Sequence, residues 1–259
     1  MKNLFLIITI IVCVSILGLS HYQYNQKLKN IAAEAHQFEQ PVIERLSNTQ
    51  STKTSNNESD DTDLSGIVGN LISNQEEEEN ISVTFFGSLS LGAPESDKGW
   101  PMLVISEING MLEKEKLKPT IVNVNRSSSL DVYNSNYFDT VIESNPDLLI
   151  VEPFILNDNG IVRIEDTLYV LEQFLNKVSD KLPETEVLII PPNPVEGAVY
   201  YISQVESVAE FAQSSGYSFV DHWTAWPIDD NLSDYLENNR PNQQGHSIWA
   251  EFMVNYLTN

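Results

Sequence analysis

Apolar residues between Ile81 and Asn259 follow two patterns: short uninterrupted runs, and longer segments in which they recur every three or four positions. The short runs are typical of buried strands, and the periodic segments are typical of amphipathic helices. The runs predict five strands, at residues 81–86, 119–124, 146–153, 185–192 and 217–223. The periodic segments predict helices at residues 100–115, 137–145, 167–182, 201–216 and 245–257. This alternation predicts an α/β fold, a flavodoxin-like three-layer α/β/α sandwich with a five-stranded parallel sheet.

Local signals support several of these boundaries. Pro101 stands in the first turn of its predicted helix, where a missing N–H group costs nothing. Asp166 or Thr167 can cap the helix at 167–182, and Gly216 can end the helix at 201–216. The run Pro146–Pro153 is apolar at consecutive positions, as expected for a central strand that is buried on both faces.

The first 20 residues have a different character. Lys2 precedes the uncharged, mainly apolar run Leu4–Leu19, which as a helix would extend ~24 Å, slightly less than a ~30 Å hydrocarbon core. A basic residue before such a run indicates a secretion signal or a signal anchor, and the lack of a nearby small-x-small cleavage site favours an uncleaved anchor. We therefore expect a domain held outside the cytoplasm at the cell membrane, or a secreted one if the segment is cleaved. A buried helix of the folded domain is the alternative.

Residues 21–80 predict a connecting segment. Their first part can form a helical stalk, whereas the rest is rich in Ser, Thr, Asn and Asp and ends in the run "NQEEEEN". Such a composition buries too little apolar surface to offset its ordering entropy. The acidic run either is solvated or binds a cation or a basic partner. The expected organisation is a signal segment at 1–20, a stalk and acidic linker at 21–80, and a folded domain at 81–259.

The charge balance limits the partners. The chain has 14 Lys and Arg residues against 37 Asp and Glu residues, a formal net charge of −23. Nucleic-acid binding requires a basic surface that neutralises phosphates, so nucleic acid is excluded as a partner. The sequence gives no indication of the oligomeric state.

Two predicted loops carry residues suited to nucleophilic chemistry. Ser88 follows the first strand in "FFGSLSLG", a glycine-containing turn that would expose a serine at the carboxyl end of the sheet. Asn157 follows the third strand in "EPFILNDNG", where its amide could stabilise an oxyanion and Asp158 could brace the loop. Each stretch is also typical of an ordinary turn. Together, however, they follow the first and the third predicted strands, in the order expected of a serine hydrolase.

In this ordered set the chain resembles the SGNH hydrolases, also called the GDSL esterase/lipase family. "FGSLSLG" resembles the family's first block, with Ser88 as the nucleophile and Gly87 where the family usually has Asp. "LNDNG" resembles the third block and implies an oxyanion role for Asn157. The ending "RPNQQGHSIWAEF" is similar to the family's "HPN..GH..WA" ending. The resemblance implies hydrolysis of small acyl esters, without a cofactor or metal.

The sequence departs from the family pattern in two places. The second block, "NVNRSSSLDV", has no glycine, so its backbone donor would come from near Asn125 or Arg126. Arg240, with Glu237 three residues before it, occupies the usual position of the catalytic histidine, and an arginine is too basic to act as a general base.

Three explanations follow from Arg240. In the first, His246 replaces the missing base; otherwise it only packs the last helix. In the second, His222 replaces the base; otherwise it belongs to a structural corner with Trp223 and Trp226. In the third, the domain binds a ligand without cleaving it. We take His246 as the expected base, beside Ser88 and Asn157. The expected function is a membrane-tethered esterase of small acyl esters, with O-acetyl groups on a surface glycan as one substrate class. The rival is an impaired domain that binds a glycan or a protein.

Overall fold

The structure is a computed structural model that describes residues 64–75, 79–92, 99–227 and 231–259. These residues contain a five-stranded sheet in the order β2-β1-β3-β4-β5, in which every neighbouring pair is parallel. The strands are β1 (Ile81–Gly87), β2 (Leu117–Asn123), β3 (Leu148–Val151), β4 (Glu186–Ile189) and β5 (Ser218–Phe219). This is the flavodoxin-like order, so the predicted fold class is confirmed.

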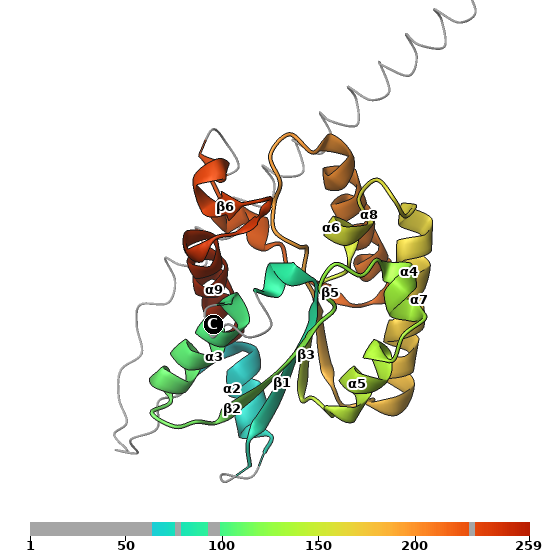
Figure 1. Cartoon of the computed structure of the whole chain (residues 1–259). Coiled ribbons are helices and arrows are strands. Elements are labelled where there is room, and N and C mark those ends of the chain that lie inside the picture. The colour runs from blue at the N-terminus through green and yellow to red at the C-terminus, as the bar shows by residue number, and fades with distance from the viewer. Residues whose placement is uncertain (1–63, 76–78, 93–98, 228–230) are drawn as a thin grey trace, which may run out of the picture. The chain divides into compact units, whose positions relative to one another are not determined.

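Helices cover both faces of the sheet (Figure 1). One face carries α2 (Gly66–Ser73), α3 (Trp100–Met111) and α9 (Gln243–Thr258). The other face carries α4 (Ser129–Tyr133), α5 (Tyr137–Glu143), α7 (Ile164–Lys181) and α8 (Val199–Ser215). Strand β3 is buried along its whole length, as the apolar run predicts, because helices pack on both of its faces.

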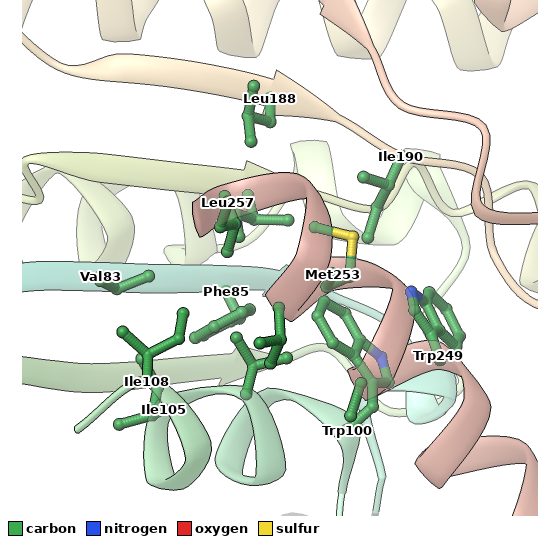
Figure 2. Close-up of a cluster of buried hydrophobic side chains, with 14 of the residues drawn as sticks. Val83, Phe85, Trp100, Ile105, Ile108, Leu188, Ile190, Trp249, Met253 and Leu257 are labelled. Carbon is green, nitrogen blue, oxygen red and sulfur yellow. The ribbon is translucent and has the colours of Figure 1, made fainter. Parts of the chain in front are cut away.

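Each face of the sheet has its own hydrophobic cluster. On the face covered by α3 and α9, Trp100 stacks on Trp249 with ring centroids 4.7 Å apart, and Figure 2 shows the two indoles side by side. Phe85 of β1 meets Trp100 edge-on at 5.3 Å. All three side chains are fully buried, so the C-terminal helix is held to the sheet by aromatic packing.

The folded part begins earlier than residue 81, which corrects the predicted boundary. Helix α2 lies within the segment 21–80 and packs on α9; Val68 is buried, and the Ser65 hydroxyl donates to the carbonyl of Thr258 at 3.0 Å. The physical reason is that "GIVGNLIS" is apolar enough to bury one face against the last helix, although polar sequence surrounds it. Residues 21–63 lie outside the described residues.

Two other details differ from the prediction. Helix α7 begins at Ile164, so neither Asp166 nor Thr167 caps it: Asp166 pairs with Arg163, and Thr167 donates to Asp158. Helix α4 was not predicted, and it is short enough to depend on its capping box, in which Ser128 and the third helical residue satisfy each other's backbone groups. The ends at Pro101 and at Gly216, whose φ is +79°, agree with the prediction.

Among the described residues, no helix is both long and apolar enough to cross a membrane. The predicted signal anchor at residues 1–20 lies outside the described residues.

Candidate active site

Ser88 lies immediately after β1, at the carboxyl edge of the sheet, in a turn that continues into a short 3-10 helix, η1 (Leu89–Leu91). Its hydroxyl donates to Oε1 of Glu152 at 2.9 Å, and it accepts from the backbone N–H of Ser90 at 3.1 Å. The backbone N–H of Ser88 donates to Oε2 of the same carboxyl group at 3.2 Å. The hydroxyl also lies 3.1 Å from Oγ of Ser90, which is a second acceptor. Ser88 is only 1% exposed, so the expectation that its turn exposes the serine is wrong, because the turn packs against Glu152.

Glu152 follows β3 directly, and it is 0% exposed. Burial raises the pKa of its carboxyl group to about 8, because the charged form loses its water shell. The two hydrogen bonds from Ser88 and the positive charge of Arg240 favour the ionised form and limit this rise. At pH 7 the carboxyl group is therefore mostly neutral, and it becomes charged as the pH rises through about 8.

Gly87 makes room for the Glu152 side chain. A Cβ atom at position 87 would lie 2.8 Å from both Cβ and Oε2 of Glu152, closer than real contacts allow. The glycine that stands where the family usually has Asp is therefore explained by packing, because a side chain at 87 and the carboxyl group of Glu152 compete for one space.

This packing yields a stability prediction. Gly87→Ala is expected to lower the free energy of unfolding by about 1–3 kcal/mol, the usual cost of overpacking. In a Glu152→Gly background the same change should cost clearly less, so that a double-mutant cycle in urea shows coupling. Gly110→Ala is the matched control, because a Cβ there meets nothing within 4 Å and a helical glycine gains stability on becoming alanine. Equal costs of Gly87→Ala in the two backgrounds would contradict the explanation.

Asn157 lies in α6 (Ile155–Asp158), the short helix after β3, and faces the loop after β2. Its side-chain amide donates to the carbonyls of Asn125 at 3.1 Å and Ser127 at 2.9 Å, so both of its protons are engaged. Asn125 itself has a φ of +58°, in the left-handed region that Asn tolerates and Gly favours. Its backbone N–H, one of the expected second-block donors, already donates to Oδ1 of Asn123 at 2.7 Å. Asp158 braces the loop, as expected, by accepting from Ser129 N at 2.8 Å and Thr167 Oγ1 at 2.6 Å.

His246, the expected base, is bonded elsewhere. Its Nδ1 accepts from the backbone N–H of Trp100 at 3.3 Å, in the first turn of α3. The N-cap residue of that helix is Gly99, which has no side chain to satisfy the free N–H groups, and His246 supplies the acceptor from α9. Burial lowers the pKa of His246 to about 4, so the ring is neutral at pH 7.

His222 is a buried structural residue. Its Nδ1 accepts from the indole N–H of Trp226 at 3.0 Å, and its Nε2 lies 2.8 Å from the carbonyl of Pro191, to which it donates in the matching tautomer. The ring stacks on Trp249 at 4.0 Å, and burial lowers its pKa to about 3. No hydrogen bond in the described part of the chain joins Ser88 to His222 or to His246.

Arg240 lies on a hairpin of two short antiparallel strands, β6 (Leu236–Glu237) and β7 (Arg240–Pro241). Asn238 and Asn239, both with positive φ, form its turn, which places Glu237 directly opposite Arg240. Burial and the nearby charge of Arg126 lower the pKa of Arg240, whereas Glu152 opposes this effect. The guanidinium is therefore close enough to act on the Glu152 carboxyl group, although no ion pair within 4.0 Å joins the two among the described residues.

A hydrogen-bond chain connects the serine turn to this hairpin. The Ser90 hydroxyl donates to Oδ1 of Asn193 at 2.9 Å, and the Asn193 amide donates to the carbonyl of Asn239 at 3.1 Å. Asn193 is fully buried in the loop after β4, where its own carbonyl accepts from the Tyr201 hydroxyl at 2.8 Å. Asn193 thus links the turn that contains Ser88 to the hairpin that contains Arg240.

The structure brings the Ser88 turn and the Asn157 loop to the same edge of the sheet, where both contact the loop of Asn125: Leu89 N donates to the Asn125 carbonyl at 3.2 Å, and Asn157 donates to it at 3.1 Å. It does not bond His246 to Ser88. Sequence reasoning missed Glu152 and Asn193. Glu152 directly follows β3, and Asn193 lies in the loop after β4. These positions were the available signal, since catalytic groups gather at the carboxyl ends of parallel strands.

Comparison with solved structures identifies the fold. A member of the lipolytic protein G-D-S-L family from Veillonella parvula matches with a TM-score of 0.56 and 13% identity, over 69% of this chain and 99% of that one. A lipase/acylhydrolase from Enterococcus faecalis matches with a TM-score of 0.56 and 18% sequence identity, over 69% of this chain and 95% of that one. An acetyl xylan esterase matches with a TM-score of 0.55 and 15% sequence identity, over 68% of this chain and 98% of that one. No family model and no curated protein matches the chain.

The described domain therefore has the fold of the SGNH, or GDSL, hydrolases, as the three sequence blocks predict. At these sequence identities the comparisons show a shared fold, and the reacting residues are identified from the geometry of this chain.

Proposed function

We propose that this protein is a serine ester hydrolase that transfers an acyl group from a small ester to Ser88 and then to water. The observation that carries the proposal is the position of Ser88 at the carboxyl edge of an SGNH-type sheet, with its hydroxyl hydrogen bonded to a buried carboxyl group. A serine in such a contact has a group beside it that can accept its proton, which is the first requirement of a nucleophile. This chemistry requires no cofactor or metal.

The proposal extends to substrate and location. The likeness to an acetyl xylan esterase supports a short acyl group, and we name O-acetyl groups on a cell-surface glycan as the substrate class. The N-terminal run Leu4–Leu19 supports a domain tethered to the cell membrane on its outer side.

The test uses the full chain. We expect hydrolysis of p-nitrophenyl acetate above the uncatalysed rate, acetate release from an O-acetylated xylan, and one fluorophosphonate label per chain on the peptide that contains Ser88. Ser90, in the same turn but bonded to Asn193, is an internal control and should carry no label. Turnover at the blank rate together with an unlabelled chain would contradict the proposal.

A ligand-binding domain without turnover is the second candidate, and one set of observations favours it. The backbone N–H of Ser88 and both amide protons of Asn157 already donate within the protein, so a substrate oxyanion would have to displace those partners. Arg240 would then serve as a fixed cation for a carboxylate ligand. An inactive, unlabelled chain that binds an acidic glycan would establish this function.

A further inference from the structure

We propose that Glu152, and not a histidine, is the catalytic residue that accepts the proton of Ser88. The inference deepens the proposed function, on which it rests, by assigning the base of the same site. Neither the resemblance to the SGNH hydrolases nor the similar structures assign a role to this position, because the family uses a histidine at the place of Arg240.

The geometry supports this assignment directly. Oε1 of Glu152 is 2.9 Å from the Ser88 hydroxyl, within the range in which a general base takes a proton without a bridging group. The backbone N–H of Ser88 holds Oε2 at 3.2 Å, so the carboxyl group is kept on the serine by two contacts. Ser90 N donates to the Ser88 oxygen from a third direction. Of the acceptors within reach of the serine proton, Oε1 of Glu152 at 2.9 Å is nearer than Oγ of Ser90 at 3.1 Å.

The alternative bases are committed to other partners. His246 accepts from Trp100 N, and His222 is held between Trp226 and Pro191. Arg240 carries a permanent charge and cannot accept a proton at working pH. Its effect is indirect: the cation near Glu152 favours the ionised carboxylate, the form that a base requires.

The reaction balances with Glu152 as the proton carrier. The Ser88 oxygen bonds to the ester carbonyl carbon while its proton moves to Oε1 of Glu152, and the carbonyl electron pair becomes an oxyanion. Collapse of this intermediate breaks the bond to the alkoxy group, which takes the proton from Glu152 and leaves as the alcohol. Water then attacks the acyl group on Ser88, Glu152 accepts the water proton, and the carboxylic acid departs as the proton returns to Ser88.

With Glu152 as the base, the reaction rate depends on pH in a defined way. Only ionised Glu152 can accept a proton, and with a pKa of about 8 roughly a tenth of it is ionised at pH 7. The rate should therefore rise with pH and level off above the pKa of Glu152. A base such as His246, with a pKa of about 4, would already be fully active at pH 6 and would give a flat profile.

The groups that face Glu152 modulate this profile. They are Ser88 from the β1 turn, Arg240 from the β6–β7 hairpin, and Tyr201 from α8, whose own pKa burial and the carboxyl group raise well above 10. Arg126 acts on Arg240. Of the groups that face Glu152, none shares its titration: Glu152 changes its charge near pH 8, whereas the pKa of Tyr201 is raised well above 10.

The experiment measures the rate of fluorophosphonate labelling of Ser88, and kcat/KM for p-nitrophenyl acetate, from pH 6 to pH 9 in the full chain. Wild type is expected to show a rise of about tenfold between pH 7 and the plateau, with a midpoint near pH 8. Glu152→Gln keeps the shape of the side chain but cannot accept the proton, and should lower both rates by about 10²- to 10⁴-fold and abolish the midpoint. Glu152→Asp, which keeps a carboxyl group, should recover part of the rate.

Asp158→Asn is the matched control. Asp158 is also a buried carboxyl group whose pKa burial raises, but it is bonded to Ser129 and Thr167 and does not contact Ser88. It should leave the midpoint near pH 8. Thermal unfolding of each variant checks that it is folded.

The outcomes separate the inference from the proposed function. Equal rates in wild type and in folded Glu152→Gln would overturn the role of Glu152 and leave the esterase intact. A wild-type rate that does not change with pH, together with loss of activity in His246→Asn, would do the same. A wild-type chain that neither turns over the ester nor takes the label would overturn both.

Discussion

Ser88→Ala is expected to lower kcat/KM for p-nitrophenyl acetate by about 10³-fold or more. Without the hydroxyl no acyl-enzyme can form, and what remains is the activity that binding alone supplies to a spontaneous reaction. A factor of 10³ corresponds to about 4 kcal/mol of transition-state stabilisation. The measurement is steady-state hydrolysis at pH 8.5, where Glu152 is mostly ionised.

The control for this prediction is Ser106→Ala, an exposed serine of α3 outside the candidate site. It should keep the wild-type rate, and both variants should unfold cooperatively. If Ser88→Ala retained more than a third of the wild-type rate, the nucleophile would have to be sought elsewhere, and the position of Ser88 would be structural.

Trp249→Ala is expected to lower the free energy of unfolding by about 3–5 kcal/mol, as is usual for removing a large buried aromatic side chain. Trp249 is fully buried and stacks on Trp100 at 4.7 Å and on His222 at 4.0 Å, and Trp226 meets it edge-on at 6.1 Å. Its removal leaves a cavity where α9, α3 and the loop after β5 meet. Urea denaturation followed by circular dichroism measures the change.

Tyr256→Ala is the matched control on the same helix. Tyr256 is 39% exposed and stacks only on Phe252, so its loss should cost less than about 1 kcal/mol. A small effect of Trp249→Ala would show that α9 is held by contacts other than this aromatic cluster, for instance by α2.

The departures from the SGNH pattern are physically related in this chain. Gly87 leaves the space that the Glu152 side chain occupies. Arg240 acts on the carboxyl group that Gly87 admits. Glu152 and Arg240 thus interact electrostatically beside Ser88, in space that Gly87 leaves open, which a comparison of separate sequence blocks does not show.

The sequence alone determined the order and type of the strands and the main helices, because apolar periodicity reports directly which face of each element is buried. It also suggested Ser88 and Asn157 as site candidates, since the turns after β1 and β3 have local compositions that signal them. It could not assign the base. His246 follows a family-like ending, but which atom meets its Nδ1 depends on where α9 packs relative to α3, and that is a long-range contact.

Tertiary structure alone decided the pairing of Ser88 with Glu152 and the packing of α2 on α9. The parallel register of β1 and β3 brings Ser88 close to Glu152, and the contact of α2 with α9 is equally long-range, so no local pattern encodes those distances. The pKa of Glu152 follows from the same packing, because a carboxyl group becomes a base of raised pKa only when the fold removes its water.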